Sequence, residues 1–261
     1  MSARAETPRN RRTTHYLVPF WLLAAAGVAL AHRWMPESTW LMVHLVVLGA
    51  LTQSIVRWSG HFAEALLKVS LRPATDRLSW PLALAVTLVL AGVPTGAWWV
   101  TLAGASAVAG IVLVHGWALL GGLRRALPGR FRAGLRYYVA ATSCLPVGAG
   151  FGVALARGQD QSWEARLLVA HTMTNLLGWL GLAVVGTLLT LWPTVLGVPA
   201  DAAGDRRARL ALPALLSGLA VTVAGALAGT PWLASVGLGV YLLGLLAHGP
   251  AFVAAWTAAR A

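Results

Sequence analysis

The sequence contains very few charged residues for its length. Only 11% of its 261 residues are Asp, Glu, Lys or Arg, whereas 58% are hydrophobic. A soluble protein of this size covers its surface with polar side chains, and this chain has too few of them to do so. The composition therefore excludes an ordinary soluble domain and predicts a polytopic membrane protein.

Acidic residues and cysteines are scarcer still. Eight residues are acidic and one, Cys144, is a cysteine. A single cysteine excludes an internal disulfide and a metal clamp made of two thiolates. The apolar segments have no central Asp or Glu of the kind that a proton-coupled carrier or cation channel is expected to use. Nucleotide-binding loops, HExxH and GxSxG motifs are missing as well, which argues against those enzyme classes.

Long apolar runs are what the sequence has in abundance. A helix needs about 20 apolar residues to cross a bilayer. The chain offers eight such runs, separated by short breaks rich in charge, Pro or Gly. We expect an all-α, polytopic membrane helical bundle, with residues 16–255 as one transmembrane domain and with tails at 1–15 and 256–261. The expected helices lie near 16–34, 39–58, 79–96, 98–121, 137–156, 165–192, 209–228 and 231–255.

The net charge of +12 is explained better by membrane topology than by nucleic-acid binding. If the N terminus is cytoplasmic, one side of the membrane collects most of the basic residues, and the other side keeps only Arg33, Arg157 and Arg166. This asymmetry follows the positive-inside rule and predicts that both termini face the cytoplasm, in the cell membrane. An alternative for the start of the chain is a secretory signal peptide that ends at "ALA", Ala29–Ala31, and its removal leaves the remaining topology unchanged.

Histidines occupy matching places in two halves of the chain, 16–121 and 137–255. His44 and His171 lie early in the second and sixth expected helices, and His115 and His248 each precede a glycine late in the fourth and eighth. Repeated halves often place a binding site at their interface. Chance is the alternative explanation in a chain this rich in Leu, Ala and Gly.

These four histidines lie inside apolar runs, where polar groups are costly unless they are paired or functional. From the helical rise, we expect His44 and His171 about 7 to 10 Å below the outer surface, and His115 and His248 about 25 Å from the outer helix ends. Two layers of paired imidazoles suit two haems b, each with two axial histidines. Asn175, one turn after His171, is expected to orient the edge of a haem or a water molecule.

Two other interpretations of the histidines stay open. Copper is the alternative metal, because neutral imidazoles together with the sulfur of Met42, Met173 or Cys144 suit Cu(I). The two methionines are each two residues from a histidine, however, which turns them to other helix faces. The third interpretation is hydrogen bonding between helices without any metal.

Three strings of the sequence carry a resemblance to known proteins: "VHLVVLGALTQSIVRWSGHFAEALL", "RYYVAATSCLPVGAGFGVALA" and "AHTMTNLLGWLGLAVVGTLLTLWPTVL". Together they resemble the membrane-embedded N-terminal region of actinobacterial multicopper oxidase and copper nitrite reductase-like proteins. The resemblance covers most of the span from Met42 to Gly197. The chain is also loosely similar to haem-copper oxidases and NnrS-like membrane proteins, which implies that His44 and His171 ligate haem or copper.

The resemblance implies a role beside copper or nitrogen-oxide redox chemistry. In the resembled proteins the helices precede extracytoplasmic cupredoxin domains, whereas this sequence lacks the His-Cys-His-Met ligands of a type 1 copper site. We therefore expect a membrane electron-transfer module, not catalytic alone, that passes electrons from quinol or another membrane donor to a separate extracytoplasmic cupredoxin-type copper protein. The alternatives are a carrier or accessory factor for copper or a small solute, and a non-redox membrane anchor for a partner enzyme.

Overall fold

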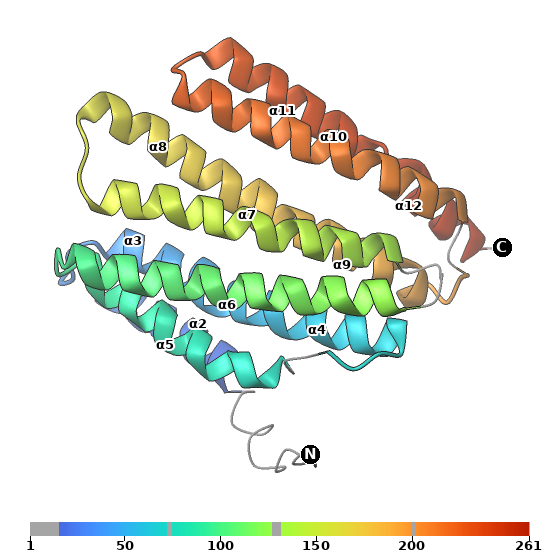
Figure 1. Cartoon of the computed structure of the whole chain (residues 1–261), viewed down its shortest axis with the longest axis horizontal. Helices are drawn as coiled ribbons and strands as arrows, with labels where there is room; N and C mark the ends of the chain where they lie inside the picture. Colours follow the sequence, from blue (N-terminus) through green and yellow to red (C-terminus); the bar gives the residue numbers. More distant parts are fainter. Residues whose placement is uncertain (1–15, 72–74, 127–131, 200–201, 261) are drawn as a thin grey trace.

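The computed structural model describes residues 16–71, 75–126, 132–199 and 202–260, and every regular element among them is a helix. Figure 1 shows long helices lying side by side, most of them along one common direction. The prediction of an all-α helical bundle is confirmed. The expected tail 1–15 lies outside the described residues, and the expected tail 256–261 begins inside a helix that ends at Ala258.

The elements follow one another with short connections. The N-terminal half contains α2 (Leu17–Ala31), α3 (Ser38–His44), η1 (Leu45–Leu51), α4 (Thr52–Leu67), α5 (Asp76–Gly92) and α6 (Trp98–Arg125). The C-terminal half contains α7 (Arg132–Ala156), α8 (Gln161–Met173), η2 (Thr174–Gly181), α9 (Leu182–Val195), α10 (Ala202–Leu227), α11 (Pro231–Leu246) and α12 (Gly249–Ala258). Two of the helices are continuous through a π-helical segment: α3–η1–α4 and α8–η2–α9.

Six helical stretches of the described chain are long and apolar enough to cross a membrane. They are Ser38–Leu67, Trp98–Arg125, Arg132–Ala156, Gln161–Val195, Ala203–Leu227 and Pro231–Ala258. The helices α2 and α5 have 15 and 17 residues, which is fewer than the roughly 20 that a bilayer requires. The structure thus supports a multi-pass membrane protein, but not the predicted count of eight spans.

Glycines let successive helices pack closely in both halves. A Cβ atom placed on Gly104 of α6 would lie 2.8 Å from the backbone nitrogen of Val89 in α5. In the same way, a Cβ atom on Gly237 of α11 would collide with the backbone of Thr222 in α10. Small residues of this kind dominate helix contacts in membranes, where burial of apolar surface adds little because lipid is equally apolar. The α5–α6 and α10–α11 pairs are therefore tight hairpins at corresponding places of the chain.

Adding one methyl group to α11 tests this packing. We expect Gly237→Ala to destabilise the protein by about 1–3 kcal/mol, the usual cost of overpacking, because the neighbouring backbone cannot yield as a side chain would. Gly239 lies on the same helix with open space where its Cβ would be, so Gly239→Ala is the matched control and should be neutral. Thermal unfolding in detergent measures both variants, and equal melting temperatures would contradict the close approach of α10 and α11.

Candidate functional site

The structure brings the two outer histidines together. His44 ends α3, His171 lies in the last turn of α8, and both side chains are half-buried. Their ring centroids are 6.2 Å apart, and the ring planes differ by 26°. A metal between two imidazoles, bound to one nitrogen of each at about 2 Å, separates the centroids by roughly 6 Å. The observed centroid separation is close to that value.

Backbone carbonyls determine which nitrogen of each ring carries the hydrogen. Nδ1 of His44 lies 2.8 Å from the carbonyl oxygen of Trp40, and Nδ1 of His171 lies 2.9 Å from that of Gly148. A carbonyl oxygen can only accept, so both Nδ1 atoms must donate. In a neutral ring, Nε2 then keeps its lone pair. Histidines that bind metals usually donate their other N–H in this way.

Neighbouring groups restrict the orientation of both rings. The indole of Trp40 stacks on His44, with centroids 4.1 Å apart and planes 22° apart. Helix α7 approaches the other ring so closely that a Cβ atom on Gly152 would lie 2.9 Å from Cε1 and 3.0 Å from Nδ1 of His171. The two imidazoles are thus held in place before any ligand binds, as a preorganised site requires.

A π-helical segment follows each of the two histidines. The segment η1 begins directly after His44, and η2 begins three residues after His171. Such segments insert an extra residue into an α-helix, are rare, and occur often at functional sites. Their composition is ordinary for a membrane helix, so no sequence signal indicated them.

A second polar contact joins the same two helices eight residues further along each of them. Nε1 of Trp179 donates to Oγ1 of Thr52 over 3.1 Å. These two residues are 127 positions apart in the chain, as are His44 and His171. Eight residues separate the two contacts on each helix. The second and sixth expected helices therefore run alongside each other in the same register.

Asn175 makes its hydrogen bond within its own helix. Its Nδ2 donates to the carbonyl oxygen of His171 over 2.8 Å and lies 3.4 Å from Nδ1 of the same residue. That Nδ1 already gives its hydrogen to Gly148, so two donors meet at the longer contact. The observed role of Asn175 is to support the turn that carries His171, and its expected contact with a haem edge stays a prediction.

The structure gives the inner histidines, His115 and His248, separate partners. His115 is 1% exposed, and its Nε2 lies 2.8 Å from Oγ of Ser59 in α4. His248 is 2% exposed, and its Nε2 lies 3.0 Å from the hydroxyl of Tyr137 in α7. Among the described residues, no ring contact joins these two histidines. The geometry favours interhelical hydrogen bonding for them over the expected second haem.

The number of available ligands separates the candidate metals. The described part of the chain contains no group of three or more His, Cys, Asp or Glu side chains placed to share a metal ion. A bare zinc or copper ion commonly takes three or four protein ligands. Haem iron needs only two, because the porphyrin supplies the rest. Met42 and Met173, the sulfur ligands considered for copper, pack against the hydrophobic core.

Comparison with known proteins gives no match for this chain among protein-family models, curated proteins or solved structures. The resemblance to the membrane region of multicopper oxidase and copper nitrite reductase-like proteins therefore stays an expectation from the sequence. Any function has to be argued from the side chains of the site itself.

The close approach of α7 to His171 can be tested with two glycines of that helix. We expect Gly152→Ala to displace the imidazole by a few tenths of an ångström and to destabilise the protein by about 1–3 kcal/mol, the cost of overpacking. Gly150 has open space where its Cβ would be, so Gly150→Ala should behave as wild type. The measurements are thermal stability and bound metal or haem per chain. A Gly152→Ala protein identical to Gly150→Ala in both would contradict this geometry.

Proposed function

We propose that this chain is a membrane electron-transfer module whose redox centre is a haem b bound between His44 and His171. The observation that supports it is the pair of imidazoles 6.2 Å apart, each with its Nδ1 hydrogen on a backbone carbonyl and with no hydrogen bond to Nε2 from the described residues. Once bound, the haem supplies one-electron chemistry at its iron. The chain's own residues position the two ligands and enclose them.

The surroundings of the pair fit a role in electron transfer. Trp40 covers one face of His44, and the glycines of α7 let its backbone reach His171. His44 and His171 would both hold the haem iron, and a haem held by two imidazoles would supply electron transfer without binding a substrate. This is the usual arrangement in membrane cytochromes that only relay electrons.

The proposed orientation places the site near the extracytoplasmic face, with both termini in the cytoplasm and eight helices crossing or entering the membrane. At the same end of the bundle, Arg157 lies over the ring of Trp98 and Arg166 over that of Trp163, with the guanidinium carbons 5.1 and 5.4 Å from the ring centroids. These stacked cations form fixed positive positions beside the α7–α8 connection. They suit an acidic surface on an extracytoplasmic cupredoxin-type copper protein, which we propose as the electron acceptor.

A copper carrier or accessory factor is the second candidate. One observation favours it: the same two Nε2 atoms could hold Cu(I), which accepts fewer ligands than Cu(II) or zinc. A protein of this kind would be colourless with Cu(I) bound and would lose the metal to chelators. Haem and copper are therefore distinguished by one optical measurement.

The optical spectrum of the detergent-purified protein tests the proposal. We expect a b-type spectrum in oxidised and dithionite-reduced samples, one haem per chain by pyridine haemochrome, and loss of the signal in His44→Ala and in His171→Ala. His61 is exposed on α4, so His61→Ala is the matched control and should keep the full signal.

Two outcomes would contradict the haem assignment. One copper per chain without haem, lost together with either outer histidine, would favour the copper carrier. Protein that contains neither haem nor copper after expression with ample iron and haem precursor would leave a non-redox membrane anchor for a partner enzyme as the remaining candidate.

The inner histidines should respond differently from the outer pair. We expect His115→Ala and His248→Ala to keep the haem signal but to lower stability by about 1–3 kcal/mol, because Ser59 and Tyr137 each lose a buried partner. Haem content and thermal unfolding of the same preparations give both readings. Loss of half the haem in either variant would instead show that a second haem is bound at the inner layer.

A further inference from the structure

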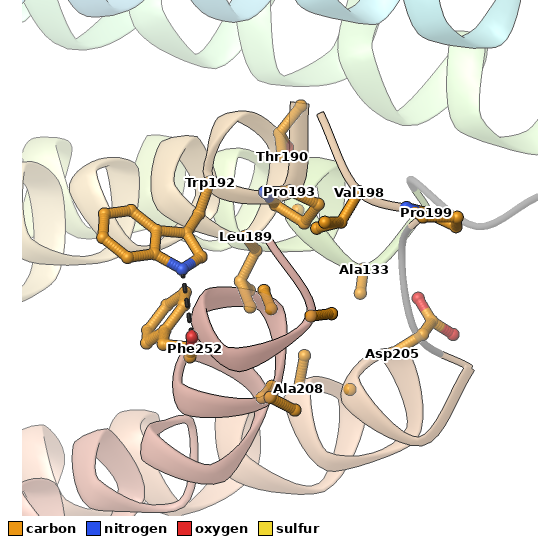
Figure 2. Close-up of a pocket in the computed structure, with 16 residues that line it drawn as sticks. Ala133, Leu189, Thr190, Trp192, Pro193, Val198, Pro199, Asp205, Ala208 and Phe252 are labelled. Atoms are coloured by element: carbon orange, nitrogen blue, oxygen red, sulfur yellow. Dashed lines mark hydrogen bonds between the residues drawn. The ribbon is translucent and has the colours of Figure 1, made fainter. Parts of the chain in front are cut away.

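A pocket of about 270 Å³ lies at the opposite end of α7 from the two outer histidines. It is formed by the first turns of α7 and α10, by the end of α9 and the residues that follow it, and by α12 along its length. Figure 2 shows Trp192 and Phe252 on one side and Asp205 on the other. The walls are mainly apolar, and alanines of α12 keep the space open.

The polar side-chain groups of Trp192 and Thr190, on the aromatic side of this pocket, are already hydrogen-bonded within the protein. Nε1 of Trp192 donates to the carbonyl oxygen of Phe252 over 3.2 Å, and the two rings lie edge to face with centroids 6.0 Å apart (Figure 2). Thr190, which also lines the pocket, donates its hydroxyl hydrogen to the carbonyl of Gly186. A ligand would therefore find an apolar aromatic surface here, without a hydrogen-bond donor directed at it from these side chains.

Asp205 is the exception in the wall. Among the residues that the structure describes, its buried Oδ1 has no hydrogen-bond partner, whereas its Oδ2 lies 3.4 Å from Nε of Arg209. The arginine balances the charge of the carboxylate, so what Oδ1 lacks is a hydrogen-bond donor and not a counter-ion. Burying an acceptor on a charged group without a donor is costly, which makes this oxygen a place where a ligand can bind favourably.

The charges around Asp205 favour a neutral ligand. Arg206 and Arg207 follow it on α10 and are exposed, and Arg209 already pairs with the carboxylate. A cation that approached Oδ1 would be repelled by these three charges. A neutral O–H group can donate a hydrogen bond to this oxygen without being repelled by the arginines. An aromatic ring of the same ligand can pack against Trp192 and Phe252 on the opposite side of the pocket.

We propose that this pocket binds a neutral, lipid-soluble phenol or hydroquinone. Its ring lies against Trp192 and Phe252, and its hydroxyl group donates to Oδ1 of Asp205. The reduced form of a membrane quinone belongs to this class, and it is the natural ligand that we expect in the pocket. That last identification rests on the proposed function, whereas binding of a phenol does not.

Two redox-inert probes of nearly equal shape test the pocket: 4-hexylphenol and its methyl ether, which lacks the donor. Isothermal titration of the full chain in nanodiscs should show the phenol binding at least about tenfold more tightly than the ether, the effect of one hydrogen bond to a charged acceptor. In Asp205→Ala the phenol should lose this advantage. Asp160 is an exposed carboxylate at the other end of the bundle, so Asp160→Ala is the matched control and should keep it.

A second variant leaves Asp205 in place. Ala255 lines the pocket on α12, and Ala255→Leu should fill it and weaken both probes. Equal affinities of phenol and ether for the wild-type chain, or an unchanged preference in Asp205→Ala, would overturn the proposal and identify the pocket as a site for lipid chains. Because neither probe exchanges electrons, phenol binding by a chain without haem would contradict only the proposed function, and haem without phenol binding would contradict only the pocket.

Discussion

A polar side chain inside an apolar helix must find its partner within the protein, because lipid offers none. The four interior histidines satisfy this constraint in two ways. His44 and His171 use Nδ1 on backbone carbonyls, whereas His115 and His248 use Nε2 on the hydroxyls of other helices. The two pairs therefore differ in which ring nitrogen is hydrogen-bonded, and the haem site that we propose uses the pair that is bonded through Nδ1.

Much of the fold could be predicted from hydrophobic runs, and the errors lie at their ends. Charged residues were taken as breaks, yet α4 continues to Leu67, nine residues past the predicted end at 58, and α7 already begins at Arg132. Long basic side chains at a helix end can reach water or lipid headgroups while the backbone stays helical. Charge in a sequence therefore does not mark where a helix ends.

The candidate site was predictable in part. Depth and the matching halves predicted that His44 and His171 lie together, and the structure places them so. The same reasoning predicted that His115 and His248 form a pair, but in the structure each has a separate partner. The depth of a residue along its helix does not determine which helices are neighbours. The π-helical segments and the carbonyl of Gly148 as a partner depend on tertiary packing, so a single sequence could not reveal them.

Five buried polar side-chain atoms of the described chain have no hydrogen-bond partner. In the described chain they are Nε1 of Trp21, Oγ1 of Thr75, Oγ1 of Thr174, Oδ1 of Asp205 and Nδ1 of His248. Trp21 packs on Gly49 in η1, and Thr174 begins η2. Asp205 lines the pocket, and the ring of His248 lies 6.4 Å from that of Phe252 in its wall. Native proteins rarely leave such atoms unsatisfied, and where they do, function is the usual reason. Thr174 follows His171 by three residues and Asp205 lines the pocket, so two of these five atoms lie beside the proposed binding places.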